Sequence, residues 1–284
     1  MRDVIVDAHT HAFPPRFVER RAELLEQDPT FAELYRNPRA KLATAEHVLA
    51  HVDRARVDVT VIAGFGWRDP ALCREHNEYL LRAAAESGGR LAAFCTLPLA
   101  DAESARLEVV RCARGGARGF GELRPESQGT SLSDDSVAAL LAWAAEAYDL
   151  PLLVHASEPV GHRYAGKQGQ SLGPLYDFVE EHAEVRVIAA HWGGGLPLYA
   201  LMPEVKVALE HVWVDTAATP LLYDTGIFRV VADLVGAGHI LFGSDFPLLS
   251  AEGQIATILQ APLTEEERDA ILGGNAARLL GLRG

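Results

Sequence analysis

The chain has 284 residues, of which 49% are hydrophobic, and its 26 basic and 39 acidic side chains give a formal net charge of −13. This apolar content argues against disorder, three cysteines are too few for a disulfide scaffold, and no apolar run reaches the roughly 18 residues of a membrane span. The negative charge argues against nucleic acid or an anionic membrane as a partner. Because no signal-peptide layout is present at the N-terminus, we expect a cytoplasmic enzyme with a small-molecule substrate, and a homodimer is the commonest state of such enzymes.

Eight short apolar segments are predicted to be buried β-strands, and each is followed by a helical segment or a long connection. In chain order they are Val4–Asp7, Val57–Ala63, Arg90–Thr96, Ala117–Glu122, Pro151–His155, Val185–His191, His211–Asp215 and His239–Gly243. Most are continuous runs of β-branched or other apolar residues, which are typical of strands buried on both faces of a parallel sheet. The fourth segment contains two glycines and fits this pattern least well.

Helix start signals lie between these segments. Asp69 followed by Pro70 predicts an N-cap and a proline in the first helical turn. Ser133 is predicted to cap a helix whose apolar residues repeat with helical spacing. Thr264 with Glu267 three residues later predicts a capping box near the C-terminus.

The alternation of eight strands with helices predicts one domain over residues 1–284, a closed (β/α)₈ TIM barrel. An open doubly wound sheet stays as the alternative, because periodicity does not reveal whether a sheet closes. The connection over residues 12–43 is long for a link between the first strand and its helix. It contains a helical pattern at Arg16–Gln27, and we interpret it as an insertion that caps the barrel mouth.

Histidine and carboxylate side chains occur where five of the predicted strands end, and in such barrels the chemistry lies at these ends. The residues are His9, His11, Glu122, His155, His191 and Asp245. Residues two apart in an extended segment point the same way, so His9 and His11 can face one ion. Imidazole and carboxylate together suit Zn²⁺ and neighbouring divalent ions, which can activate a bound water.

Each of these residues has a simpler explanation when it is taken alone. A single His-x-His pair is a weak signal, and His155 or His191 could be a buried histidine bonded to a carbonyl. Glu122 could pair with Arg124, and Asp245 could belong to a turn. The coincidence of metal-compatible groups at five strand ends favours a shared metal site.

Several motifs together resemble the amidohydrolase superfamily, in particular the amidohydrolase-related branch that also contains aminocarboxymuconate-semialdehyde decarboxylase. The segments that carry the resemblance are Asp7–His11 (DAHTH), Val154–Ala156 (VHA), Ala190–Gly194 (AHWGG), Gly243–Pro247 (GSDFP) and Gly274–Leu280 (GNAARLL). The resemblance implies a distorted barrel with one or two divalent ions at its mouth. The implied ligands are His9, His11, His155 and Asp245.

The resemblance also implies roles for individual residues. Asp245 would be the general base in a hydrolytic member, and His191 either a ligand of a second ion or a group that polarises the substrate. Glu122 stands where binuclear members carry a bridging group. We expect one strongly bound Zn²⁺, with a second ion as an option and Mn²⁺ or another divalent ion as an alternative.

Two reactions and one inactive state are compatible with this ligand set. We expect first a hydrolase that uses metal-activated water on an amide, ester or lactone, because a bridging Glu122 is associated with hydrolytic chemistry in the superfamily. The alternative is a metal-dependent non-oxidative decarboxylase of a small aromatic or unsaturated carboxylic acid. A barrel that has lost activity and serves as a binding protein is the third hypothesis, and the complete ligand set argues against it.

Substrate contacts are expected from cationic and aromatic residues near the strand ends and from the loop over residues 158–171. The candidates are Trp67, Arg68, Arg124, His162, Arg163 and Trp192, with Lys167 as a further cation. For each charged residue the simpler explanation is a solvated surface charge. For both tryptophans it is packing in the core or a loop.

Overall fold

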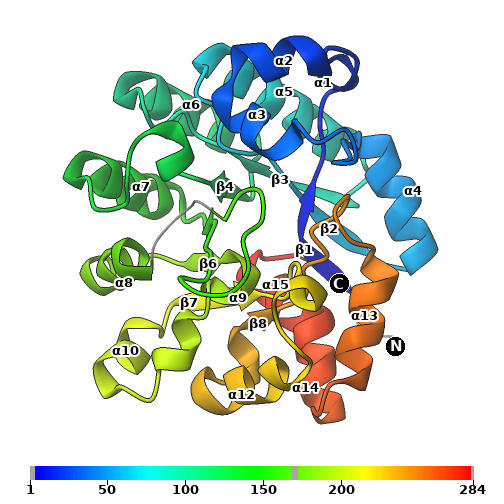
Figure 1. Cartoon of the computed structure of the whole chain (residues 1–284), viewed down its shortest axis with the longest axis vertical. Coiled ribbons are helices and arrows are strands. Elements are labelled where there is room, and N and C mark those ends of the chain that lie inside the picture. The colour runs from blue at the N-terminus through cyan, green and yellow to red at the C-terminus, as the bar shows by residue number, and fades with distance from the viewer. Residues whose placement is uncertain (1–3, 168–171, 283–284) are drawn as a thin grey trace.

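The computed structural model describes residues 4–167 and 172–282 of the chain. Eight parallel strands pair in chain order and are surrounded by helices (Figure 1). The strands are β1 (Val6–His11), β2 (Val59–Ala63), β3 (Leu91–Cys95), β4 (Gly119–Leu123), β5 (Leu152–Val154), β6 (Val187–Ala189), β7 (Val212–Asp215) and β8 (Ile240–Leu241). Each parallel pair joins neighbours in sequence, as expected when a helix connects one strand to the next.

The sheet closes on itself between β1 and the segment that follows β8. The Ala8 amide donates to the Phe242 carbonyl at 2.7 Å, and the Asp245 amide donates to the His9 carbonyl at 2.8 Å. An open sheet would leave these edge groups without such partners. The predicted (β/α)₈ barrel is therefore confirmed, and the open-sheet alternative is wrong.

Helices cover the outside of the barrel and fill its connections (Figure 1). Their bounds are α1 (Pro15–Glu19), α2 (Arg21–Gln27), α3 (Pro29–Tyr35), α4 (Ala45–Ala55), α5 (Pro70–Glu86), α6 (Ala102–Arg114), α7 (Asp135–Tyr148), α8 (Leu172–Glu181), α9 (Ala190–Gly193), α10 (Pro203–Ala208), α11 (Thr219–Leu222), α12 (Gly226–Val235), α13 (Ala251–Gln260), α14 (Glu265–Asp269) and α15 (Asn275–Leu279), with short turns at η1 (Glu126–Gln128), η2 (Leu196–Tyr199), η3 (Ala237–His239) and η4 (Ala270–Gly274). Among the described residues, no helix has the length and apolar character needed to cross a membrane.

Local capping signals were accurate at two of the three predicted helix starts. The Asp69 carboxylate accepts hydrogen bonds from the first turn of α5, and Thr264 forms the predicted capping box of α14. The prediction for Ser133 is wrong, because α7 begins at Asp135 and Asp134 is its N-cap residue. The Asp134 carboxylate accepts from a backbone amide of the preceding turn, so the turn extends past Ser133 before the helix begins.

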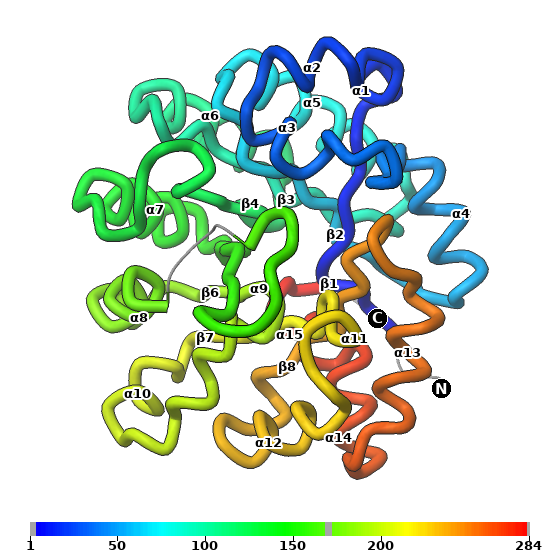
Figure 2. Tube along the Cα trace, viewed as in Figure 1, coloured from blue at the N-terminus to red at the C-terminus, as the bar shows by residue number. Residues whose placement is uncertain are grey.

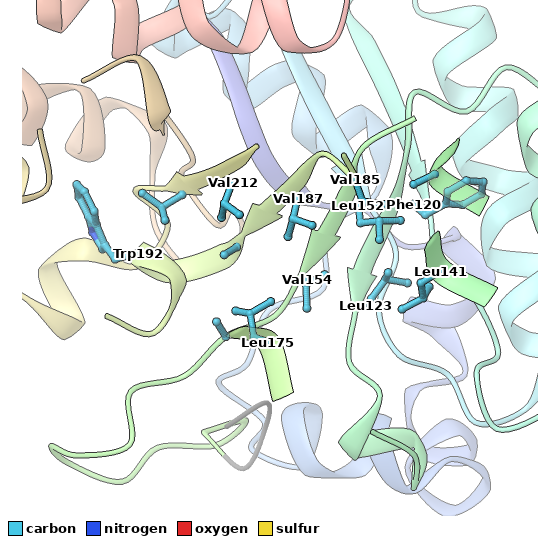
Figure 3. Packing of buried hydrophobic residues seen from close by; sticks show 14 of the residues in the cluster. Phe120, Leu123, Leu141, Leu152, Val154, Leu175, Val185, Val187, Trp192 and Val212 are labelled. Carbon is cyan, nitrogen blue, oxygen red and sulfur yellow. The ribbon is translucent and has the colours of Figure 1, made fainter. Parts of the chain in front are cut away.

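Apolar strand residues are divided between two sides of the barrel wall. Alternate residues such as Leu152 and Val154 face the helices in the main core, whereas Leu153 between them belongs to a cluster inside the barrel. Figure 3 shows part of the outer layer, with Val154 and Val187 on neighbouring strands. The interior is thus filled by side chains, and free space lies beyond the strand ends.

The first predicted strand is longer than its apolar run indicated. The apolar run predicted a strand over Val4–Asp7, but β1 continues to His11. The polar residue Thr10 can lie in the buried part of this strand because its hydroxyl donates to the Val61 carbonyl at 2.6 Å. The two glycines of β4 are explained by close packing. A Cβ at Gly119 would lie 2.4 Å from the Phe94 ring.

We predict that Gly119→Ala lowers the free energy of unfolding by about 1–3 kcal/mol, because the added methyl must displace the buried Phe94 ring. Urea unfolding followed by circular dichroism measures the change. Gly173→Ala in α8 is the matched control, since nothing lies within 4 Å of the added methyl and alanine favours a helix. A Gly119→Ala variant as stable as Gly173→Ala would contradict the packing argument.

The segment between β1 and α4 contains three helices, where one helix over Arg16–Gln27 was expected. The helical pattern is interrupted at Arg20, and this break allows Phe17 on α1 and Leu24 on α2 to enter the same aromatic cluster. That cluster also includes Phe65 and Trp67 from the segment after β2. The inserted helices are therefore packed onto the barrel rather than loosely attached.

A buried histidine links this cluster to the end of β1. His76 on α5 accepts a hydrogen bond at Nδ1 from the Trp67 indole (2.9 Å), so its Nε2–H donates to the Ala12 carbonyl (2.6 Å). Burial lowers the pKa of His76 from 6.5 to about 4. The ring is consequently neutral in the folded protein at neutral pH.

His76 should make the stability depend on pH in a defined window. Between pH 6.5 and 4 the unfolded chain protonates this histidine and the folded chain does not, so its contribution is present above this window and lost as the pH falls through it. We expect the wild type to lose about 3 kcal/mol more than His76→Gln over this range. Urea unfolding of both proteins in chelator measures the difference. Parallel pH profiles would contradict it.

Candidate metal centre

Six polar side chains predicted from the strand ends gather at one end of the barrel. They are His9 and His11 on β1, Glu122 on β4, His155 after β5, His191 after β6 and Asp245 after β8. Each is less than one-tenth exposed. Burial of so many polar groups requires that they satisfy one another or bind a ligand.

The four histidine rings lie next to one another. The ring centroid of His9 is 5.1 Å from that of His11 and 5.2 Å from that of His191. The ring centroids of His191 and His155 are 5.1 Å apart. The histidines of the first strand therefore point toward those of the fifth and sixth. Strands far apart in the sequence converge on one space.

Nitrogen and oxygen atoms of β1 and the β8 segment face each other in this space. The Nε2 atoms of His9 and His11 are 3.2 Å apart. The Asp245 Oδ1 atom lies 3.5 Å from Nε2 of His11 and 4.0 Å from Nε2 of His9. This is a donor set of the kind that binds divalent transition ions.

Glu122 joins this group to the other two histidines. Its Oε1 accepts from Nδ1 of His155 at 2.7 Å and lies 3.4 Å from Nε2 of His191, and its Oε2 lies 3.8 Å from Nε2 of His11. Two sets of three ligand atoms, each within 4.8 Å of one another, share Glu122. The first set comprises His9, His11 and Glu122, and the second comprises Glu122, His155 and His191.

Asp215 at the end of β7 orients the centre and was missed by the sequence analysis. Its Oδ2 accepts from Nδ1 of His9 at 2.7 Å, and its Oδ1 accepts from the backbone amide of His191 at 2.9 Å. Because Nδ1 carries a proton toward Asp215, Nε2 is the His9 nitrogen directed at the centre. The position of Asp215 at the end of a strand was the signal that could have identified it.

Buried carboxylates make the centre attractive to a cation. Burial lowers the pKa of His9, but the negative charges of Asp215, Asp245 and Glu122 outweigh this effect and raise it to about 10. Burial and the positive charge of Arg124 instead lower the pKa of His155 to about 4. The residues thus fit a divalent ion, which would replace the proton on His9 and meet a neutral His155.

Unusual backbone conformations position two of these side chains. His191 and Asp245 both have positive φ angles, 55° and 59°, which are rare for residues other than glycine. After His191 the chain turns through glycines, and a Cβ at Gly194 would lie 2.7 Å from the Ser157 carbonyl oxygen. Such strain is typical of functional sites.

A cavity of about 550 Å³ opens directly above the centre, within the usual range for small-molecule sites. Of the predicted substrate contacts, Arg124 and His162 line it. Arg124 is 4% exposed, and its Nη2 donates to the Gly166 carbonyl at 2.9 Å. The loop that contains Gly166 crosses in front of the strands (bright green in Figure 2). Residues 168–171 of the predicted contact loop lie outside the described residues.

The other predicted contacts lie elsewhere. Trp67 is fully buried in the aromatic cluster, and Trp192 is buried beside Phe228 and donates through its indole to the Thr219 hydroxyl. Three predicted cations also lie outside the cavity lining. Arg68 donates to the Ser127 carbonyl, and Arg163 is exposed. Lys167 donates to the carbonyls of Val160 and His162. Both tryptophans thus have the packing role that was their simpler explanation.

The sequence analysis did not identify most of the cavity wall. Its aromatic and apolar members include Leu34, Tyr35, Phe65, Tyr164, Leu221, Leu222 and Leu248. Several come from the inserted helices and from α11, which have no motif of their own. They give the cavity an apolar and aromatic wall beside the polar residues of the centre.

This barrel and its centre belong to the amidohydrolases: the sequence model of the amidohydrolase family matches residues 6–282, and the chain is a member of that family. Among curated proteins it is similar to gamma-resorcylate decarboxylases. The enzyme from Polaromonas sp. is 24% identical over 253 residues, covering 74% of this chain and 76% of that one. The enzyme from Rhodococcus jostii is 25% identical over 256 residues, covering 74% and 77%.

Solved structures show the same fold. A 2,6-dihydroxybenzoate decarboxylase from Rhizobium superposes with a TM-score of 0.76 at 18% identity, covering 100% of both chains. A 5-carboxyvanillate decarboxylase from Novosphingobium aromaticivorans, with bound manganese, superposes with a TM-score of 0.80 at 16% identity, covering 99% of this chain and 96% of that one. The resemblance to the amidohydrolase-related branch is confirmed.

We predict that Asp215→Asn lowers the affinity for Zn²⁺ or Mn²⁺ by about 10–100-fold, because His9 loses the carboxylate that orients its ring. Competition with a chromophoric chelator measures the dissociation constant. Asp224→Asn, at an exposed turn before α12, is the control and should bind metal like the wild type. Equal affinities for all three proteins would contradict the assignment.

Proposed function

We propose that the protein is a divalent-metal-dependent, non-oxidative decarboxylase of a small aromatic carboxylic acid. The observation that carries the proposal is a buried histidine–carboxylate centre that opens, beside the buried cation Arg124, into a cavity with apolar and aromatic lining. The similarity to decarboxylases of hydroxylated benzoates supports the same reaction. Hydrolysis, which the sequence analysis placed first, becomes the second hypothesis.

The ion would be held by His9, His11 and Glu122, with Asp245 Oδ1 beside both histidines, while His155 and His191 form the second ligand group through Glu122. The manganese in a similar structure and the mixed imidazole and carboxylate donors favour Mn²⁺ or Zn²⁺. When bound, such an ion supplies positive charge that orients the carboxylate and an adjacent hydroxyl oxygen of the acid.

Arg124 would bind the carboxylate that is lost. Its guanidinium is buried, lines the cavity and has an Nη1 atom 3.4 Å from Nδ1 of His155. Planar guanidinium groups bind carboxylates through paired hydrogen bonds, which are strengthened where water is excluded. Arg124 therefore places the scissile carbon–carbon bond next to the centre.

Asp245 would transfer the proton that the reaction needs. Decarboxylation of a hydroxybenzoate adds a proton to the ring carbon that bears the carboxylate, after which that carbon–carbon bond breaks and carbon dioxide leaves. Burial raises the pKa of Asp245, but the hydrogen bond from His11 and the nearby histidines outweigh it and lower the pKa. The lowered pKa keeps Asp245 ionised at rest, so it would first have to take up a proton from solvent when the substrate is bound, and it would then deliver that proton to the ring carbon. His191 would hydrogen-bond the hydroxyl oxygen.

The test compares two products on one metal-loaded enzyme. Hydroxybenzoates are assayed for carbon dioxide, and esters, lactones and amides are assayed for hydrolysis. We expect carbon dioxide from hydroxybenzoates and a fall of about 10²–10⁴-fold in kcat for Asp245→Asn, because a group that transfers a proton typically contributes this much. Removal of the ion by chelator should abolish turnover, and added Mn²⁺ or Zn²⁺ should restore it.

Asp224→Asn serves again as the control variant, because its side chain lies at an exposed turn. Metal content is measured for each variant, so that loss of the ion and loss of proton transfer are separated. Hydrolysis that exceeds carbon dioxide release would favour the second hypothesis, for which the sharing of Glu122 by two ligand groups is the supporting observation. Full activity in metal-loaded Asp245→Asn would remove Asp245 from its assigned role.

A further inference from the structure

Two cations line the outer part of the cavity. Arg39 and Lys41 belong to the segment between α3 and α4, and both side chains are exposed. Arg124, the cation beside the centre, is buried. The acidic members of the described lining are Glu122 and Asp245, both in the metal centre. The cavity mouth is therefore positive.

Arg21 holds this cationic segment in place. Its guanidinium donates to the backbone carbonyls of Tyr35 at 2.5 Å, Asn37 at 2.6 Å and Ala40 at 2.9 Å. The side chain of Asn37 accepts in turn from the amide of Arg39 at 3.0 Å. A backbone clamped at three carbonyls presents its side chains from a defined position, which reduces the entropy lost on binding.

The positive surface continues beyond the cavity. A neighbouring groove of about 530 Å³ shares Lys41 with the cavity and is also lined by Arg21 and Arg54. The whole chain carries a charge of −13, so a positive region at this place is a local exception. Such a region attracts anions to the cavity mouth and raises their rate of association.

A substrate with a single carboxylate would need only one of the two cationic regions, either Arg124 beside the centre or Arg39 and Lys41 at the mouth. The group that is lost would meet Arg124 and the metal centre at the buried end of the cavity. The cavity is also lined by apolar and aromatic side chains, including Phe65, Leu221 and Leu222. An aromatic ring can pack against these side chains. Arg39 and Lys41 are exposed whereas Arg124 is buried, so the two regions can bind different anionic groups of one molecule.

We propose that the substrate is an aromatic diacid whose second carboxylate, on the side of the ring remote from the metal centre, is bound by Arg39 and Lys41. This inference rests on the proposed decarboxylase function and specifies its substrate class. The two residues determine specificity and do not touch the reacting carbon. Their removal should therefore raise KM for a diacid and leave kcat nearly unchanged.

The test uses a matched pair of probes with the manganese-loaded enzyme. 2-Hydroxyterephthalate carries a second carboxylate across the ring, and its neutral 4-carboxamide has nearly the same shape. We expect kcat/KM for the diacid to exceed that for the amide by at least about tenfold, as for a charge-assisted hydrogen bond. The double variant Arg39→Gln/Lys41→Gln should lose this preference through KM.

Arg36→Gln is the matched control, because Arg36 is exposed on the same segment but lies outside the cavity lining. It should keep the wild-type preference for the diacid. Equal kcat/KM values for diacid and amide in the wild type, or an unchanged preference in the double variant, would overturn the inference.

A binding measurement separates this inference from the proposed reaction. Calorimetry of both probes with manganese-loaded protein reports the preference for the second carboxylate without any turnover. If neither probe releases carbon dioxide but the double variant alone loses the binding preference, the decarboxylase function fails and the diacid site stands. If carbon dioxide is released and both probes bind equally, the reaction stands and the diacid site is wrong.

Discussion

The hydrogen bonds that close the barrel determine where this protein can perform chemistry. They join β1 to the segment after β8, from opposite ends of the chain, with the Asp245 amide on the His9 carbonyl at 2.8 Å. The Asp7 carboxylate reinforces the seam by accepting from the Ser244 amide at 2.9 Å. His9 and His11 on one side of the seam and Asp245 on the other are thereby held on a backbone that cannot separate without opening the sheet. The centre is a consequence of the closed fold rather than of any single motif.

Negative charge buried at this seam explains the rest of the site. Asp215, Glu122 and Asp245 surround His9 and keep its pKa near 10, so the centre attracts a cation. The same field would repel an acidic substrate unless positive charge offset it. In the proposed function a divalent ion and the buried Arg124 provide that offset, and the cations at the mouth extend it to the surface. In the proposed function, the buried carboxylates therefore bind the metal ion, and the ion together with the nearby cations allows an acidic substrate to bind.

Reaction class and substrate class depend on different parts of the molecule. The strands supply a centre that suits hydrolysis and decarboxylation alike, which is why Glu122 alone was a weak guide to the reaction. The cavity wall comes from the inserted helices, the loop after β5 and α11, and these segments determine which molecule can reach the centre. The similarity to decarboxylases supports the proposed reaction, whereas the cations on the insertion support the proposed substrate class.

Apolar periodicity and capping signals were enough to predict the eight strands and the order of the residues at their ends, because these signals report burial and local geometry. They favoured a barrel, but its closure is visible only in the hydrogen bonds between β1 and the segment after β8. The sequence also determined the helix start at Asp69. The folded chain was needed to show that Asp215 orients His9, that Trp67 packs in the core, and that Arg39 lines the cavity. These facts depend on which segments meet when the sheet closes and the insertion packs, and no local pattern encodes contacts between residues so distant along the chain.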